Sequence, residues 1–394
     1  MEITMEKFDC RLVKALLCVI VWVPLMAWGQ DDPWYATQPS CVIEGADPGR
    51  TREYKAEGIE QFHNIVWSTA IENANPDLDL LCYEDKIFFG NKGYDEKTGK
   101  LVWEISELQK YHIGRSIIYK GHMYLTLYLY HQGQHSRKYM GIVDINIATK
   151  SMKMLNMPIE TEASPGSMLA FNEMLFTSSA TYIFAYSLKT NQVLWRTAAK
   201  NRTGVQLATD GERLFAEYKN RIAAYDIKTG KPQWIYNESS QDIIYKNGMV
   251  YTECMGGVWA LNSKTGKVIW HYIPDNMDED QFLPNQLHIN EKNIYFTSAN
   301  GHDGNLYSLD RLTGKLNFKI HGLARPVLHA DALYVDDISI PYYENIIKVL
   351  NEKDRQLYSI KLPISGSYEF PKGKNLLFYE YVSKKKTVIL TLIN

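Results

Sequence analysis

Short stretches of alternating apolar and polar residues, separated by turn-forming residues, follow one another along most of the chain. Residues 213–218 and 221–225 are an example, with Lys219 and Asn220 between them. Alternation with a period of two, bounded by Gly, Asn and Asp, is typical of strands joined by hairpins. After the N-terminal region, no long segment shows the 3.6-residue periodicity of a helix. The pattern therefore predicts an all-β protein.

One phrase recurs between these strands and ends in an aromatic residue. Its clearest copies are Ala224–Trp234, with the sequence AYDIKTGKPQW, and Ala260–Trp270, with the sequence ALNSKTGKVIW. Further good copies occupy residues 93–103, 185–195 and 308–318, and weaker copies occupy 141–154 and 349–358. In the good copies the aromatic lies eight residues after an Asp, Asn or Ser, with Thr at plus three and Gly or Asn at plus four.

This phrase is a tight turn between two strands, followed by a large flat side chain. Asp or Asn can accept hydrogen bonds from the backbone amides ahead of it, and Gly tolerates a positive φ. The aromatic residue buries roughly 150–250 Å² and is expected to dock one sheet against its neighbour. The predicted docking residues are Trp67, Trp103, Trp195, Trp234, Trp270 and Phe318.

The spacing of these anchors predicts the architecture. They fall at 103, 154, 195, 234, 270, 318 and 358, at intervals of about 36 to 51 residues, which is the length of a propeller blade. Trp67 lies on an anchor strand with no blade before it, whereas the residues after Tyr358 offer three strands and no anchor. The N-terminal strand is therefore expected to complete the C-terminal blade, which leaves no exposed sheet edge at the closure. This predicts an eight-bladed β-propeller of four-stranded antiparallel blades, with seven blades as the alternative because the unit from Trp67 to Trp103 is short.

The N-terminus has the character of an export signal. Basic residues precede an apolar run from Ala15 to Trp28, and Ala27-Trp28-Gly29 matches a small-x-small cleavage site. The run has about 14 residues, whereas a membrane-spanning helix needs roughly 20. We expect a signal peptide over residues 1–29, an N-terminal extension over 30–55 and the propeller over 56–394. An uncleaved anchor is the alternative to cleavage.

The net charge and the cysteine content bear on which partners the chain binds and on whether it forms a disulfide. The 43 basic and 45 acidic residues give a net charge of -2, which argues against the basic surface that nucleic-acid binding requires. Cys41, Cys82 and Cys254 follow the predicted signal peptide. Two alternatives stay open for these cysteines: a disulfide between Cys41 and Cys82, or three buried free thiols.

Two loops are candidate contact surfaces for a protein partner. Aromatic residues combined with Arg are typical of energetically important protein contacts, although an ordinary solvated loop is the alternative for both. The candidates are Tyr130, His131, His135 and Arg137 in one loop, and Tyr342 and Tyr343 in the other. The sequence contains no GxSxG, HExxH, GxGxxG or phosphate-loop motif, so we expect no catalytic, cofactor-binding or metal-binding residues.

The phrase Ala/Leu-x-Asp-x-x-Thr-Gly-Lys-x-x-Trp resembles the repeat of pyrroloquinoline quinone (PQQ) propellers, over residues 56–394. One branch of that superfamily contains periplasmic dehydrogenases, which are larger, hold quinone and Ca²⁺ in the central funnel and commonly stack the quinone on adjacent cysteines. This chain has no adjacent cysteine pair. The other branch contains non-catalytic scaffolds of the BamB type, which serve outer-membrane barrel assembly and are similar in length, export and repeat pattern. Those scaffolds carry a lipid on a Cys that follows a small residue, whereas Cys18 follows Leu17, so a lipid anchor is not expected here.

The resemblance implies a monomeric, non-enzymatic periplasmic scaffold that needs no cofactor. It would bind a protein partner through loops on one face of the ring, with no nucleic acid and no membrane span. Two alternatives stay open. One is an immunity or inhibitor protein that binds a toxin in the same compartment, and the other is a quinone- or sugar-linked enzyme with its site in the funnel.

Overall fold

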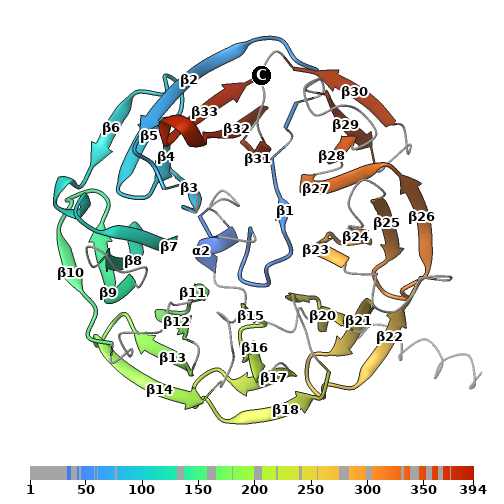
Figure 1. The fold of residues 1–394 in the computed structure, drawn as a ribbon. Coiled ribbons are helices and arrows are strands. Elements are labelled where there is room, and N and C mark those ends of the chain that lie inside the picture. Colours follow the sequence, from blue (N-terminus) through green and yellow to red (C-terminus); the bar gives the residue numbers. More distant parts are fainter. Residues whose placement is uncertain are drawn as a thin grey trace, which may run out of the picture.

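The described residues form a closed ring of eight β-sheets around a central channel (Figure 1). Among these residues no helix is long and apolar enough to cross a membrane. The predicted signal peptide lies outside the described part of the chain. The computed structural model describes residues 33–36, 42–43, 46–56, 58–59, 61–75, 78–130, 137–157, 166–179, 181–198, 206–218, 221–238, 242–254, 256–274, 284–298, 304–329, 332–337, 346–351, 357–362, 367–372 and 374–394.

The first four blades each have four antiparallel strands, which follow one another from the channel outwards. Blade 1 contains β3 (Leu80–Tyr83), β4 (Lys86–Phe89), β5 (Lys92–Asp95) and β6 (Leu101–Glu104). Blade 2 contains β7 (His112–Tyr119), β8 (His122–Tyr130), β9 (Arg137–Asn146) and β10 (Met152–Met154). Blade 3 contains β11 (Met168–Phe171), β12 (Met174–Ser178), β13 (Tyr182–Ser187) and β14 (Gln192–Ala198). Blade 4 contains β15 (Leu207–Thr209), β16 (Arg213–Tyr218), β17 (Arg221–Asp226) and β18 (Pro232–Tyr236).

The remaining four blades complete the ring. Blade 5 contains β19 (Ile243–Lys246), β20 (Met249–Cys254), β21 (Gly257–Asn262) and β22 (Val268–Tyr272). Blade 6 contains β23 (Pro284–Ile289), β24 (Asn293–Ser298), β25 (Asn305–Asp310) and β26 (Leu316–His321). Blade 7 contains β27 (Leu323–His329), β28 (Ala332–Asp337), β29 (Ile346–Asn351) and β30 (Leu357–Lys361), and β1 (Glu53–Tyr54) adds a parallel fifth strand to it. Blade 8 contains β31 (Ser367–Lys372), β32 (Asn375–Val382), β33 (Thr387–Ile393) and β2 (Ile65–Glu72).

The ring closes as predicted, because strand β2 forms the outer strand of blade 8. Trp67 on β2 lies opposite Leu392 on β33. The amide of His63 donates to the carbonyl of Asn394 at 2.7 Å, and the amide of Asn394 donates to the carbonyl of Asn64 at 3.2 Å. The eight-bladed prediction is confirmed and the seven-bladed alternative is wrong. The unit from Trp67 to Trp103 is short because the first two hairpins of blade 1 are tight, yet it holds a complete sheet.

The antiparallel order divides the connections between two faces of the ring. Connections between the first and second strands and between the third and fourth strands lie on one face, which we call the turn face because it carries the Asp-x-x-Thr-Gly turns. Connections between the second and third strands, and the links from each blade to the next, lie on the opposite face, which we call the link face. The two faces therefore present different parts of the repeat.

The contact between blades 3 and 4 shows how the recurring phrase works. Asp226 accepts two hydrogen bonds from Thr229 at 2.8 Å, one from its amide and one from its hydroxyl. The Thr229 hydroxyl is the largest cause that lowers the pKa of Asp226 below its usual value. Gly230 closes the turn at φ +67°, and a Cβ there would lie 2.5 Å from the Trp195 ring. Trp195 Nε1 donates to the carbonyl of Ile227 at 3.0 Å. Glycine is therefore required both by its φ and by the indole packed against it.

The same arrangement recurs between other blades. In each case the Trp of one blade packs on the turn glycine of the next and donates to the carbonyl that follows the turn Asp or Asn. The sets are Trp67 with Gly99 and Glu96, Trp234 with Gly266 and Ser263, and Trp270 with Gly314 and Arg311. Since one blade cannot bury both of its own faces, these contacts between neighbours hold the ring together.

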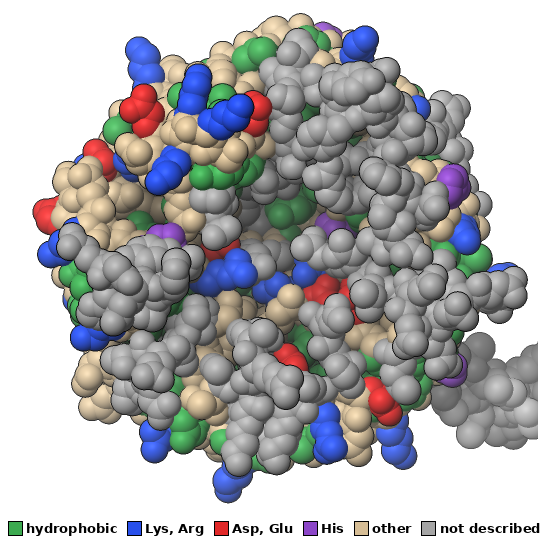
Figure 2. All heavy atoms as spheres, in the orientation of Figure 1, with side chains coloured by type: hydrophobic (Ala, Val, Ile, Leu, Met, Phe, Trp, Pro, Cys, Tyr) green, Lys and Arg blue, Asp and Glu red, His purple; other side chains and the backbone are tan. Residues whose placement is uncertain are grey.

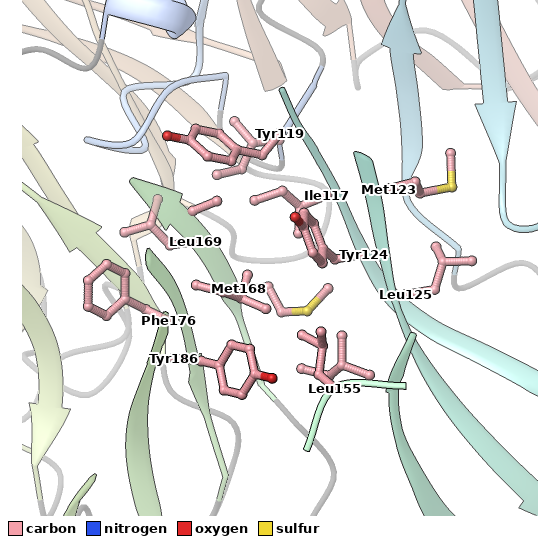
Figure 3. Close-up of a cluster of buried hydrophobic side chains, with 14 of the residues drawn as sticks. Ile117, Tyr119, Met123, Tyr124, Leu125, Leu155, Met168, Leu169, Phe176 and Tyr186 are labelled. Atoms are coloured by element: carbon pink, nitrogen blue, oxygen red, sulfur yellow. The ribbon is translucent and has the colours of Figure 1, made fainter. Parts of the chain in front are cut away.

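Between blades, the core is filled by large side chains of the inner and middle strands. Figure 3 shows one such cluster at the boundary of blades 2 and 3, with Tyr119 and Tyr124 on one side and Met168, Phe176 and Tyr186 on the other. All five side chains are buried. The packing of blade on blade therefore buries a series of apolar clusters around the ring.

Candidate functional site: the central channel and the link face

The N-terminal segment lies inside the ring, where α2 (Pro33–Ala36) and β1 occupy the channel (Figure 1). Amides of the innermost strands donate to carbonyls of this segment in successive blades. The pairs are Ile118 to Val42, Thr209 to Pro48, Tyr245 to Gly49 and Ile289 to Thr51, at 2.8–3.0 Å. Further along, β1 pairs in parallel with β27. The segment is therefore bonded to blades 2, 4, 5, 6 and 7 from within.

This segment packs closely against the channel wall. Val42, Arg50 and Thr51 are at most 3% exposed. A Cβ added at Gly49 would lie 2.3 Å from the carbonyl oxygen of Tyr245, so only glycine permits that approach. The described part of the N-terminal segment is thus packed inside the channel as an integral part of the fold.

A buried ion pair ties the segment to the wall. Arg52 donates to both carboxylate oxygens of Asp242, at 2.6 and 3.0 Å, and to the carbonyl of Leu287 at 2.7 Å. Arg52 and Asp242 are 8% and 3% exposed. In Figure 2, basic and acidic side chains meet in the hollow at the centre of the ring. Two-point pairing of a guanidinium with a carboxylate fixes both geometry and register, so it locks the segment in place.

Two ionisable groups beside this pair favour their uncharged forms. Burial raises the pKa of Glu253 well above its ordinary value, and the charge of Asp242 raises it further. Burial lowers the pKa of His288 to about 3, and the charge of Arg52 acts in the same direction. The imidazole of His288 is therefore neutral at neutral pH, and the raised pKa of Glu253 favours the uncharged form of that carboxyl beside the Arg52–Asp242 pair.

The residues of the channel do not fit the quinone and Ca²⁺ that the resemblance to the dehydrogenases would place there. Residues 46–56 run through the channel and bond to the inner strands of blades 4, 5, 6 and 7. Within the described ranges, no group of three or more His, Cys, Asp or Glu is arranged to hold a metal ion. Cys82 and Cys254 are buried free thiols in blades 1 and 5. Cys41 lies outside the described residues, so the possible Cys41–Cys82 disulfide is not part of this structure.

The predicted partner-contact residues belong to the link face as far as the structure describes them. Tyr130 ends β8 and Arg137 begins β9, at the connection between the second and third strands of blade 2. His131, His135, Tyr342 and Tyr343 lie outside the described residues. Their role in binding stays a prediction, as does the energetic contribution of the docking aromatics.

Sequence reasoning missed a groove on the link face, beside blade 1. It has a volume of about 400 Å³ and runs between the link from β2 to β3 and the link from β6 to β7. Asn75 donates to Ile113 O at 3.4 Å and lies 3.1 Å from His112 Nε2, which ties the two links together. Asn91 donates to the carbonyl of Ile105 at 2.9 Å and fixes the β4–β5 turn beside them. These Asn residues are scattered over the sequence and each is ordinary in a turn, so no spacing signal revealed the groove.

An eight-bladed ring in which Trp residues dock on Asp-x-x-Thr-Gly turns is the architecture of a PQQ-repeat propeller. The family described as outer membrane protein assembly factor BamB matches residues 92–356, which is more than half of the chain. The chain therefore belongs to this family, and the resemblance stated from the sequence is confirmed.

Two solved structures share the fold. BamB from Moraxella catarrhalis has a TM-score of 0.58 and 16% identity, and the match covers 83% of this chain and 97% of that one. The quinohemoprotein alcohol dehydrogenase ADHIIG from Pseudomonas putida HK5 has a TM-score of 0.62 and 10% identity, with 90% of this chain and 80% of that one covered. At such identities the likeness shows the fold alone. No match was found among curated protein sequences.

Proposed function

We propose that this chain is a non-enzymatic scaffold of the periplasm that binds a protein partner through the link face. The observation that carries the proposal is the N-terminal segment bonded inside the channel. A ring whose funnel holds its own N-terminal segment keeps a rigid rim for contacts and gives up part of the funnel that a cofactor and substrate would need. The name of the matching family, an outer membrane protein assembly factor, supports the same class of function.

The connections on the two faces differ in a way that favours the link face as the binding surface. On the turn face, the turns that end in Gly99, Gly230, Gly266 and Gly314 share one Asp/Asn-x-x-Thr-Gly sequence and are already engaged with Trp residues of the neighbouring blades. On the link face, the links range in length from the single residue Gly322, between β26 and β27, to the 13 residues 155–167, between β10 and β11. Varied loops on a rigid frame are typical of recognition surfaces.

Crosslinking in the native host, followed by mass spectrometry, tests the proposal because exposed lysines lie on both faces. Lys110, Lys384 and Lys385 report on the link face, and Lys97, Lys228 and Lys264 report on the turn face. We expect crosslinks to one stable protein partner at the first set and none at the second. Recovery of no stable partner, or crosslinks confined to the turn face, would contradict the proposal.

The enzyme alternative is tested on the same purified protein. Addition of PQQ and Ca²⁺ is expected to give no dye reduction above a protein-free control, because the N-terminal segment lies in the channel. Saturable turnover would contradict the scaffold proposal and would support an enzyme with its active site in the funnel. The inhibitor alternative differs from the scaffold only in the identity of the partner, which the crosslinking experiment determines directly.

A further inference from the structure

The groove beside blade 1 combines an apolar floor with polar groups at its rim. Leu78, Phe89, Leu108 and Ile113 supply apolar surface. The volume of about 400 Å³ lies within the range of ligand pockets, roughly 300–1,000 Å³. The groove lies across blade 1, because its walls include the link that enters this blade after β2 and the link that leaves it before β7. It is therefore a shaped depression on the face that we assign to partner binding.

Two polar groups of the rim are available to a ligand. Within the described part of the chain, neither the side-chain amide of Asn73 nor the hydroxyl of Tyr111 makes a hydrogen bond to another protein group, and both residues line the groove. An Asn side chain and a Tyr hydroxyl can each both donate and accept a hydrogen bond. Each peptide unit likewise presents one donor and one acceptor. The rim thus complements the main chain of an extended peptide.

The charges of the lining favour an uncharged ligand. Glu72 and Lys92 both line the groove, so one acid is balanced by one base. A charged ligand would have to give up its hydration without a net opposite charge to compensate for it, which is unfavourable. An anion such as phosphate, or a strongly basic segment, therefore matches the groove poorly.

The aromatic rings of the groove are engaged with other side chains. The ammonium of Lys110 lies 5.1 Å from the centroid of the Tyr111 ring and covers one of its faces. His112 packs edge-on against Tyr128, with centroids 6.5 Å apart, and its Nε2 lies beside Asn75. A sugar needs an open ring face on which to stack, so these contacts favour a peptide over a carbohydrate.

We propose that this groove binds an extended, uncharged peptide segment of the protein partner, with one apolar side chain of the segment placed on the floor. The inference rests on the proposed scaffold function and names the chemistry of what the link face recognises. Asn73 and the Tyr111 hydroxyl bond the main chain of the segment, and the apolar floor selects Leu, Ile, Met or Phe at its centre.

The test uses the full chain and a library of randomised peptides displayed on phage. Peptides are selected for binding to the wild-type protein. Those that also bind the double variant Asn73→Gly, Tyr111→Phe are removed by counter-selection. Glycine is chosen because the backbone at Asn73 has φ +52°, which glycine tolerates. Tyr381→Phe is the matched control, since Tyr381 is 36% exposed, lies on β32 and does not line the groove. Neither groove substitution removes a protein hydrogen bond from the described structure, so all three proteins are expected to unfold at the same temperature.

Enriched peptides are expected to be uncharged around a central apolar residue. Synthetic copies with blocked ends should bind the double variant at least about tenfold more weakly than wild type or Tyr381→Phe, as the loss of two hydrogen bonds implies. No enrichment over the double variant, or enrichment of charged peptides, would overturn the inference. Saturable binding of maltotriose or chitotriose that the double variant loses would also overturn it, in favour of a carbohydrate. If a partner nevertheless crosslinks to the link face away from the groove, the scaffold function stands and the groove alone fails.

Discussion

The boundaries between neighbouring blades, which we call seams, are not all held by the same outer contact. The seams on either side of blade 2 differ in this contact from the seam between blades 3 and 4. In the latter, Trp195 lies on a glycine and is 8% exposed. Between blades 1 and 2, Lys150 stands in the glycine position at φ +60°, and its ammonium lies 6.0 Å from the centroid of the Trp103 ring. Between blades 2 and 3, the Trp is replaced by Met154, which is 51% exposed. At the boundary of blades 1 and 2, a cation above the indole therefore takes the place of the Trp–Gly contact. At the boundary of blades 2 and 3, the aromatic ring of that contact is missing.

The seam between blades 2 and 3 is held from the channel side instead. The Tyr35 ring lies 5.9 Å from that of Tyr119 in blade 2, and its hydroxyl donates to the carbonyl of Ala170 in blade 3 at 2.7 Å. Tyr119 accepts a hydrogen bond from the amide of Glu173 at 3.2 Å, and Lys120 pairs with Glu173 across the seam. The buried cluster of Figure 3 lies at the same boundary. Loss of the outer contact is thus accompanied by additional inner contacts.

The largest expected effect is a difference in stability between variants of the two kinds of seam. Trp195→Ala should lower the free energy of unfolding by about 3–5 kcal/mol, because it removes a buried ring and leaves a cavity. Met154→Ala should cost less than about 1 kcal/mol, because that side chain is half exposed. Denaturant unfolding followed by Trp fluorescence and circular dichroism measures both. Equal losses would mean that the outer contact is equally important at both seams.

The next effect concerns the glycine position. Gly230→Ala should cost about 2–4 kcal/mol, since it combines a left-handed φ with a methyl group pressed against Trp195. Lys150→Gly relieves the same backbone strain but removes the cation from Trp103, so we expect a change of less than about 1 kcal/mol. Thermal unfolding of the two variants tests this difference. A small effect of Gly230→Ala would show that the ring can shift to accommodate the methyl group.

A smaller effect should report the inner contact. Tyr35→Phe keeps the ring but removes the hydrogen bond to the carbonyl of Ala170, which should cost about 1 kcal/mol. Tyr381→Phe, on an exposed side chain, is the control. If Tyr35→Phe is as neutral as the control in urea unfolding, the N-terminal segment does not brace this seam through that bond.

The smallest effect is a local response to acid. The hydroxyl of the neighbouring Thr lowers the pKa of Asp226 and of Asp310 below the usual value, so these turns are stabilised above the pKa of the unfolded chain, near 3.8, and lose that contribution as the pH falls through the folded value. The turn of blade 2 has Asn146 at this position, which does not titrate. Hydrogen exchange should therefore show that the protection of Thr229 and Thr313 amides falls below about pH 4, while that of Thr149 changes less. Parallel loss at all three amides would indicate global unfolding instead.

The ring could be predicted because its contacts repeat at short range in the sequence. The Trp indoles reach carbonyls 29 to 44 residues further along, within the next repeat. The turn residues and the aromatic at plus eight are therefore visible as one periodic phrase. The predicted loops at Tyr130 and Arg137 came from composition alone, and the structure places only their backbone on the link face.

The place of the N-terminal segment inside the channel could not be predicted in the same way. Arg50 and Arg52 contact Ser167, Asp242 and Leu287, which are 117, 190 and 235 residues away. Such contacts occur once and leave no period in the sequence. The groove beside blade 1 has the same origin, since it exists only where two links and a hairpin turn come together.

The sequence by itself determined the blade, the number of blades and the way the ring closes. Those features depend on a local turn and on a Trp side chain that packs against the same turn in the next repeat. The tertiary structure alone decided that the N-terminal segment occupies the channel and that a groove lined by one acid and one base opens on the link face. Both depend on closing the ring first, because only closure brings inner strands and links from distant repeats within bonding distance of one another.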